Sequence, residues 1–356
     1  MNLRGSQKKV VLTALALFGV WSSACNIVRT PTATAPDIST TPPPHPTLTH
    51  EESISVPEFR GRVYRNLVHV TGQLPGRAYD VDVALETDEI VFVSDGFSKD
   101  PKLFIQSIHG GTPRQLTAGA GADIQPKYSP DGKYIAYPSN REGTFDIYVR
   151  EADGSGAPWR ITDGRWDELH PSWNPEGTHL AYCAPDERGI WTIWVVELDG
   201  LVHTQLIPGF NPEWSPDGQR LAFQSPNSQG TASDGIWVIG IDGGQLRPVV
   251  VDPRFGAIEP SWDPYGERLV FTSTERVSSK DQLTDRSDLW VVGLDGAPPY
   301  RLLDHGHRDY APAWGLDGRI YFTSHRSGTD QIFSIRAPRL DSPFDSDNSA
   351  LPEESR

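Results

Sequence analysis

Short apolar runs alternate with turn residues at regular intervals through most of the chain. Five segments share a proline, an aromatic residue two places later and a turn that ends in glycine. They begin at Pro126, Pro171, Pro212, Pro260 and Pro312, which are 45, 41, 48 and 52 residues apart. A run of apolar and aromatic residues follows each, at 134–137, 180–182, 221–223, 269–271 and 320–322. In most copies a second proline fixes one backbone angle and the glycine allows a positive one, which predicts tight hairpins.

Each repeat continues with further strand-like runs. Second apolar runs lie at 146–149, 193–196, 236–239, 289–292 and 332–335. Asp-Gly turns close most of them, and several units end with a short third run such as 160–162 or 301–303. Four short strands in about 40–50 residues are typical of one propeller blade. A ring of such sheets buries both faces of each, with the recurring Trp or Tyr packed between neighbouring blades.

A sixth unit precedes these five. Its central strands are expected at 89–93 and 102–108, and residues 79–85 would form its inner strand. The last unit ends near Arg336 without an outer strand, and Val63–Val70 could supply it, which would remove two exposed sheet edges. The sequence therefore predicts an all-β, six-bladed propeller of four-stranded antiparallel blades over 58–338, closed by an N-terminal strand.

The N-terminus has the features of an export signal. Residues 1–25 contain a basic pair and then the apolar run 10–20, which is too short to span a bilayer comfortably. Small residues ending in Ala24 precede Cys25, an arrangement that resembles a bacterial lipobox. The resemblance implies acylation of Cys25 and a membrane anchor made of lipid alone. The alternative is cleavage after Ala24 and free secretion.

Composition completes the domain plan. Residues 26–57 are rich in Thr and Pro and are expected to form an extended tether, and 339–356 read as a disordered acidic tail. The formal net charge of -15 disfavours a nucleic-acid partner. Cys183, the second of two cysteines, lies in a strand-like run and is expected to be a small buried residue.

The repeat resembles that of the TolB propeller family over about residues 63–338. The unit at 123–163 matches it most closely, through Ser139-Asn-Arg141-Glu-Gly143 and Asp146-Ile-Tyr148. The unit at 309–336 repeats the pattern. The resemblance implies a six-bladed propeller in the cell envelope. The small N-terminal α/β domain of TolB has no counterpart in 26–57, so a role in a Tol–Pal machine is not implied.

A propeller binds ligands where its inner strands converge, at the mouth of the central channel. Residues just before the repeated proline are expected near this mouth. They are Asp123, Glu168, His170, Glu259 and Asp309. They could form an acidic ring that binds a cation or a basic peptide. Alternatively, the acids accept hydrogen bonds from neighbouring backbone and fix the start of each blade.

For other polar residues the choice between a ligand contact and a structural role is also open. Arg141 and Arg326 occupy equivalent places and could contact an anion, although a repeated Arg more often pairs with a nearby Asp. His305 and His307 lack an identifiable third ligand, so neither a metal nor another cofactor is predicted. The longest insertion within a blade, 274–287, is either a recognition loop or a disordered insertion.

Two functional hypotheses follow. The first is a lipid-anchored binding or scaffold protein outside the cytoplasm, on the cell membrane or the outer membrane, presenting a rigid surface to an envelope protein or glycan. It assigns no catalytic residue. The second is an enzyme, because some propellers of this repeat type resemble metal-dependent lyases acting on acidic saccharides. Such lyases use His ligands near the channel, where only His170 is expected here.

Overall fold

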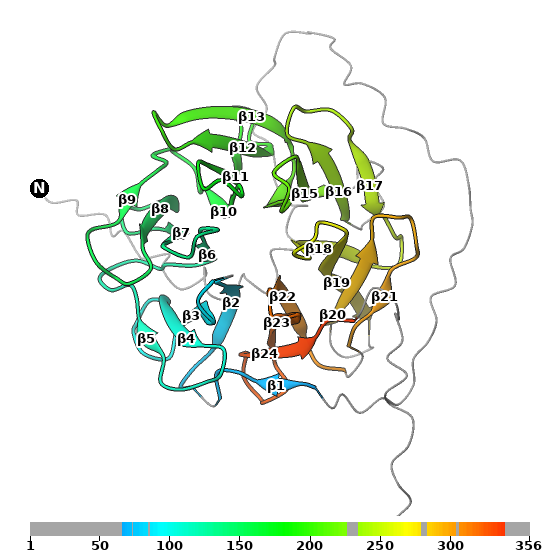
Figure 1. Ribbon diagram of the computed structural model, residues 1–356, viewed down its shortest axis with the longest axis horizontal. Coiled ribbons are helices and arrows are strands. Elements are labelled where there is room, and N and C mark those ends of the chain that lie inside the picture. The colour runs from blue at the N-terminus through cyan, green and yellow to red at the C-terminus, as the bar shows by residue number, and fades with distance from the viewer. Residues whose placement is uncertain are drawn as a thin grey trace, which may run out of the picture. The chain divides into compact units, whose positions relative to one another are not determined.

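The computed structural model describes residues 66–72, 74–84, 86–225, 234–278, 283–303 and 306–338. Six four-stranded antiparallel sheets are arranged as blades around a central axis, with their inner strands nearest the axis (Figure 1). The predicted all-β, six-bladed propeller is therefore confirmed. Within the described part of the chain, no helix is long and apolar enough to cross a membrane.

The first three blades follow one another along the chain, each running from its inner to its outer strand. Blade 1 contains β2 (Ala78–Val83), β3 (Glu89–Ser94), β4 (Lys102–Ser107) and β5 (Arg114–Gln115). Blade 2 contains β6 (Lys127–Tyr128), β7 (Tyr134–Ser139), β8 (Asp146–Glu151) and β9 (Trp159–Arg160). Blade 3 contains β10 (Leu169–Trp173), β11 (His179–Pro185), β12 (Trp191–Glu197) and β13 (Val202–Pro208).

The other three blades repeat this order, except that the last borrows its outer strand. Blade 4 contains β14 (Phe210–Trp214), β15 (Arg220–Ser225), β16 (Gly235–Gly240) and β17 (Arg247–Val250). Blade 5 contains β18 (Gly256–Trp262), β19 (Arg268–Ser278), β20 (Leu283–Gly293) and β21 (Tyr300–Arg301). Blade 6 contains β22 (Asp309–Trp314), β23 (Arg319–Ser324), β24 (Gln331–Arg336) and β1 (Val68–His69).

The ring is closed by β1, which confirms the predicted N-terminal strand. Val68 pairs with Ser334 and His69 with Phe333 in an antiparallel ladder of two residues. Next to it, the Val70 N–H donates to the Ile332 carbonyl at 2.9 Å, and Val70 is 4% exposed. The strand is shorter than the predicted Val63–Val70, whose first three residues lie outside the described residues.

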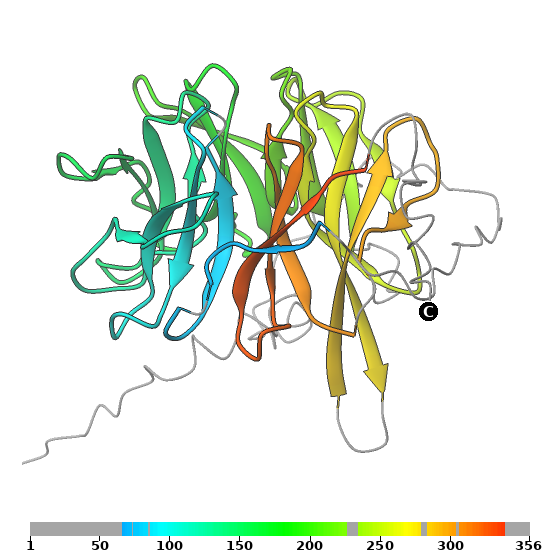
Figure 2. The ribbon, with the colours of Figure 1, turned by 60° about the horizontal axis from the view of Figure 1, so that its bottom comes forward.

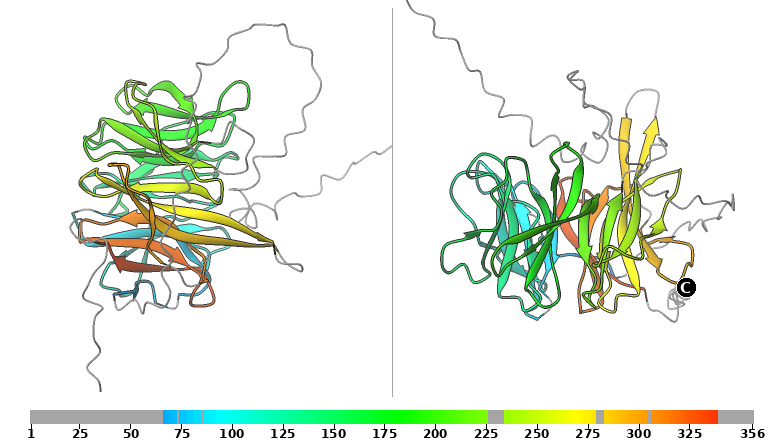
Figure 3. Two further views of the ribbon diagram at one scale, coloured as in Figure 1. Left: turned by 90° about the vertical axis from the view of Figure 1, so that its right-hand side faces the viewer. Right: turned by 90° about the horizontal axis from the view of Figure 1, so that it is seen from above.

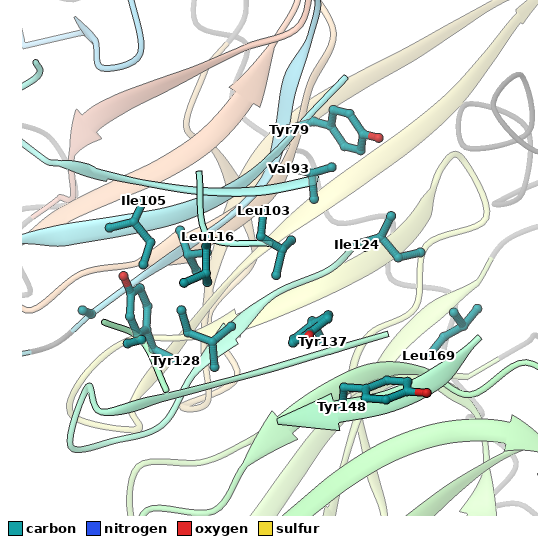
Figure 4. Packing of buried hydrophobic residues seen from close by; sticks show 14 of the residues in the cluster. Tyr79, Val93, Leu103, Ile105, Leu116, Ile124, Tyr128, Tyr137, Tyr148 and Leu169 are labelled. Atoms are coloured by element: carbon teal, nitrogen blue, oxygen red, sulfur yellow. The ribbon is translucent and has the colours of Figure 1, made fainter. Parts of the chain in front are cut away.

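The aromatic residue of each repeat packs between blades, as expected. The indole N–H of Trp173 in blade 3 donates to the Lys127 carbonyl of blade 2 at 3.1 Å. Trp262 of blade 5 makes the same bond to the Glu213 carbonyl of blade 4 at 3.0 Å. Buried aliphatic and aromatic residues of blades 1 to 3, among them Leu103, pack into one cluster (Figure 4). Blades 2 and 3 and blades 4 and 5 are thus joined by directional bonds, and blades 1 to 3 also share a packed core.

One hairpin extends well beyond its blade. β19 and β20 pair over 11 residues, from Arg268 with Gly293 to Ser278 with Leu283. Their inner neighbour β18 pairs only as far as Gly256 with Thr274, so the hairpin continues past the start of β18. Figures 2 and 3 show it standing out from one face of the propeller. Much of the predicted insertion 274–287 is therefore a β-ribbon, and its tip lies outside the described residues.

Candidate functional site at the mouth of the central channel

Each blade has one residue in the left-handed backbone region, no later than the middle of its inner strand or, in blade 2, two residues before that strand. The six positions are equivalent, one per blade, and each lies directly before the repeated proline or its counterpart. They are Asp80, Gln125, His170, Asn211, Glu259 and Ala311, with φ between 47° and 54°. Five of the inner strands also show a register shift at this point, which identifies a β-bulge. Such backbone is unfavourable for residues other than glycine, so surrounding contacts must hold it.

Those contacts run from blade to blade around the channel. The Asp80 carboxylate accepts a hydrogen bond from the Gln125 N–H. The Gln125 side-chain oxygen in turn accepts from the His170 N–H at 3.0 Å. Between blades 5 and 6, Glu259 Oε2 accepts from the Ala311 N–H at 2.9 Å and from the Thr272 hydroxyl at 2.9 Å. Each of these side chains fixes the bulge of the following blade.

Some hydrogen-bond acceptors of the ring do not take part in holding the bulges. Within the described residues, Asp80 Oδ2 and Asn211 Oδ1 are buried and have no hydrogen-bond partner. Burial, followed by the charge of Glu259, raises the pKa of Asp80 to about 7. Ala311 lies between Asp80 and Glu259 in the order of the blades and contributes only a methyl group. Two of the six ring positions, in blades 1 and 4, therefore hold a buried acceptor atom without a partner among the described residues.

A second layer of charge lies two residues further along the inner strands. The Lys127 ammonium is 3.5 Å from Asp82 and 3.1 Å from Glu213. Burial lowers the pKa of Lys127, but the two carboxylates outweigh it and the pKa is raised overall. The Tyr128 N–H of blade 2 donates to Asp82 at 2.8 Å, again joining neighbouring blades. In this layer one ammonium group is thus shared between two carboxyl groups, whereas no cation is paired with Asp80 or Glu259 among the described residues.

The structure brings His170 and Glu259 to the ring, both partly exposed. The Nε2 atom of His170 lies 3.1 Å from the Gln125 side-chain nitrogen. Burial, together with the Lys127 charge, lowers the pKa of His170 to about 3, so its imidazole is neutral. Glu259 also matches the alternative interpretation, in which the acids hold the start of each blade, because its carboxylate accepts a backbone hydrogen bond from the next blade.

Asp123 and Asp309 do not join this ring, which corrects the prediction of five residues crowded together. Asp123 is fully buried and lies 3.0 Å from the Lys102 ammonium and 3.2 Å from the Arg141 guanidinium. Asp309, also fully buried, accepts two bonds from Arg326 at 2.7 and 2.8 Å. Both arginines predicted as possible anion contacts are thus paired with acids of the same blade, because a buried carboxylate needs a partner of opposite charge.

Glu168 lies beside blade 2, away from the ring. The residue is 6% exposed, and the negative charge of Asp146 adds to burial in raising the pKa of its carboxyl group. The free oxygens, Glu168 Oε2 and Asp146 Oδ2, have no hydrogen-bond partner among the described residues. Burial raises the pKa of Glu168 to about 7, whereas Arg160 donates to the other oxygen of Asp146 at 2.9 Å. This acid pair is a second correction to the predicted ring.

The acid pair predicts a pH dependence of stability. The pKa of Glu168 is about 7 in the folded protein, against 4.5 for an ordinary glutamate. Its contribution is therefore fully present below about pH 4.5 and is lost as the pH rises to about 7, by up to about 3 kcal/mol. We expect Glu168→Gln to lose less stability than the native chain between pH 5 and pH 8, measured by urea unfolding. Glu176→Gln, at an exposed position, is the control; a Glu168→Gln loss equal to the native one would contradict this assignment.

The ring residues that the sequence analysis missed have identifiable signals. Asp80 belongs to the first unit, which lacks the Pro-x-Trp segment and could not be aligned with the rest. Gln125 and Asn211 stand directly before the repeated proline but carry no charge. Of the predicted pair His305 and His307, the first lies outside the described residues, as does Cys25.

The described residues offer few other candidates for a metal site or a nucleophile. No group of three or more His, Cys, Asp or Glu side chains is placed there to hold a metal ion. Cys183 is fully buried, as predicted, and burial raises the pKa of its thiol to about 12. A thiol with that pKa is protonated at neutral pH and is a poor nucleophile.

Solved structures with the same fold include proteins of different function. A putative TolB from Agrobacterium tumefaciens is 19% identical, with a TM-score of 0.59 over 77% of this chain and 98% of the other. TolB from Acinetobacter baumannii is 15% identical, with a TM-score of 0.50 over 74% of this chain and 63% of the other. An oligogalacturonate lyase from Vibrio parahaemolyticus is 15% identical, with a TM-score of 0.51 over 77% of this chain and 92% of the other. These likenesses establish the fold alone.

Sequence comparison is more specific. A search of curated proteins found no match. The family model described as the TolB beta propeller domain matches residues 84–211 and 191–340, which together make up well over half of the chain. The resemblance seen in the repeat is thereby confirmed, and the chain belongs to the TolB beta propeller domain family.

Proposed function

We propose that this chain is a binding or scaffold protein that acts outside the cytoplasm and presents the mouth of its channel to an envelope protein or glycan. The observation that carries the proposal is the ring of acceptor groups around that mouth. Asp80, Asn211 and Glu259 are partly exposed polar residues on the bulges of the inner strands. A partner group that donates hydrogen bonds, above all a cationic one, would pair with the exposed part of these side chains.

The position of the long hairpin supports a binding surface on the same face of the propeller as the ring. β19 and β20 extend past the first residue of β18, so the hairpin stands on the face where the inner strands begin. The left-handed residues of the ring lie near that same end of their strands. A partner seated on the channel mouth would therefore also meet the hairpin. Rigid ring residues lose little freedom on binding, which favours affinity.

A capture experiment tests the proposal. Tagged native chain and the double variant Asp80→Asn/Glu259→Gln are used to capture proteins and glycans from solubilised cell envelopes. We expect the variant to lose most of the captured partner, because both carboxyl groups leave the ring while a side-chain oxygen remains at each position. Asp131→Asn/Glu176→Gln removes two exposed acids outside the ring and is the matched control. Equal capture by all three proteins would overturn the proposal.

The second candidate is a metal-dependent lyase acting on acidic saccharides. His170 is the observation that favours it, since a neutral imidazole near the channel mouth is a possible metal ligand. Its Nε2 atom already lies 3.1 Å from the Gln125 amide, so metal binding would require that contact to open. Metal analysis of the purified chain separates the two candidates: a stoichiometric transition metal lost in His170→Ala favours the lyase.

The proposed location depends on Cys25, which lies outside the described residues. If this thiol is acylated, the chain is anchored to the cell membrane or outer membrane by lipid alone. We expect Cys25→Ser to move the protein from the membrane fraction to the soluble extracytoplasmic fraction, as seen by immunoblotting after cell fractionation. Native protein that is already soluble after export would contradict the anchor.

A further inference from the structure

A cavity lies at the junction where β1 closes the ring, between blades 6 and 1. Its volume is about 300 Å³, at the lower end of the range for small-molecule sites. It is lined by β1 and β24, by the turn after β4, and by β23 with the turn that precedes it. Figure 1 shows β1 beside β24 and next to blade 1. The turn before β23 follows the end of β22, so this cavity lies at the opposite end of the blades from the ring.

Arg319 contributes a fixed guanidinium group to the wall of the cavity. Its Nε donates to Ser334 Oγ at 2.9 Å, and its Nη2 donates to the carbonyls of Ser334 and Asn66 at 3.0 and 2.6 Å. These acceptors are all neutral, and no acid in the part of the chain that the structure describes forms an ion pair with this side chain. In the same blade, by contrast, Arg326 is paired with Asp309 at 2.7 Å. The charge of Arg319 and the hydrogens of its Nη1 thus stay available to a ligand.

Much of the remaining wall is apolar. Val68, Val70 and Ile108 contribute aliphatic side chains. The ring of His69 stacks on that of Phe333, with the centroids 4.3 Å apart. Burial lowers the pKa of His69, so its imidazole is neutral at pH 7 and adds a flat surface without adding a charge. The cavity therefore combines a cation with apolar walls.

Asp317 limits the charge that the cavity can accept. This residue also lines the cavity, and its Oδ1 accepts a hydrogen bond from the Arg319 backbone N–H at 3.1 Å. Its Oδ2 accepts from the Tyr321 hydroxyl at 2.7 Å. Arg319 and Asp317 together carry no net charge. A dianion such as phosphate would be repelled by the Asp317 carboxylate, whereas a monoanion pairs with the guanidinium against half of that repulsion.

We propose that this cavity binds a small organic monocarboxylate with a short aliphatic body. The carboxylate accepts hydrogen bonds from the Arg319 guanidinium, whose planar geometry suits that group. The aliphatic body lies against Val68, Val70 and Ile108, and its removal from water adds to the affinity. The exposed imidazole of His109, which also lines the cavity, can donate a further hydrogen bond to the carboxylate. Because β1 forms part of the wall, such a ligand also stabilises the closed ring.

Titration calorimetry of the purified full chain at pH 7 tests the site, with isocaproate as the probe and isocaproamide as its uncharged counterpart. We expect saturable binding of isocaproate and weaker binding of the amide, by roughly tenfold or more, because charge-assisted hydrogen bonds are lost. Inorganic phosphate should bind no better than the amide. Arg319→Met should weaken isocaproate binding by a similar factor. Arg336→Met, which removes an exposed arginine outside the cavity, is the matched control and should bind like the native chain.

A second variant keeps the test decisive if Arg319→Met fails to fold. Val68→Trp leaves the guanidinium and its hydrogen bonds in place but fills the cavity from β1, so it should also lose isocaproate binding. Val68 is 44% exposed, and Val202→Trp, at a position 57% exposed on blade 3, is its matched control. The proposal is overturned if isocaproate does not saturate the native chain or if the amide or phosphate binds as tightly. Native-like binding by Val68→Trp would also overturn it.

Discussion

Removing residues 1–72 is expected to lower the melting temperature by roughly 10 °C or more, whereas removing residues 1–57 leaves it unchanged. The longer truncation deletes β1 and the residues that follow it. Val70 and Thr71, 4% and 5% exposed, lose their place against blade 6. Burying one such aliphatic side chain is worth about 1.5–3 kcal/mol.

Polar contacts add to this loss. The Thr71 hydroxyl donates to the buried Gln331 side chain at 3.0 Å and accepts from the Ile332 N–H at 3.1 Å. Unpaired buried groups cost about 1–3 kcal/mol each. A total near 5 kcal/mol corresponds to a shift of about 10 °C or more for a domain of this size. The truncation also leaves β24 as an open edge, so we expect increased aggregation.

Thermal unfolding followed by circular dichroism measures both truncations beside the full chain. The 1–57 truncation is the matched control, because it removes most of the same N-terminal segment but leaves β1 in place. Equal melting temperatures of the two truncated proteins would show that β1 does not hold the ring closed.

Much of the fold could be predicted because the same sequence unit occurs five times along the chain. The proline, the aromatic residue and the glycine turn of each copy determine one hairpin, and a spacing of about 40–50 residues determines one blade. The missing outer strand after Arg336 then required a strand from elsewhere. Only the region upstream of blade 1 offered one, and β1 lies there.

The candidate site could be predicted less well, because position in a repeat does not say which way a side chain points. Asp123 stands three residues before a repeated proline and Glu259 directly before one, and the sequence analysis placed both positions near the channel mouth. They differ in surroundings: Asp123 lies beside Lys102 and Arg141, whereas Glu259 lies on a bulge at the channel. The residue type at the bulge carries no signature, because Asp, Gln, His, Asn, Glu and Ala all occupy it, and only its place before the repeated proline recurs. At Gln125, His170 and Ala311 a hydrogen bond from the preceding blade holds the left-handed backbone, and those bonds are known only from the structure.

The largest single-residue effect is expected at the ion pair of blade 6. Arg326 donates to both oxygens of Asp309, at 2.7 and 2.8 Å, and Asp309 is fully buried. Removing one partner of a buried pair leaves an uncompensated charge and costs about 3–5 kcal/mol. We therefore expect Arg326→Met to lower the free energy of unfolding by about that amount, measured in urea at pH 7.

The double variant Arg326→Met/Asp309→Leu distinguishes charge burial from loss of packing. Replacing both charges with apolar groups is often neutral, so we expect it to recover most of the stability lost by Arg326→Met. Arg336→Met, at an exposed position on β24, should change stability by less than about 0.5 kcal/mol. If Arg326→Met instead behaved like Arg336→Met, the guanidinium would not be needed to neutralise Asp309. Arg326 would then be available to an anionic ligand, the role that its place in the repeat first suggested.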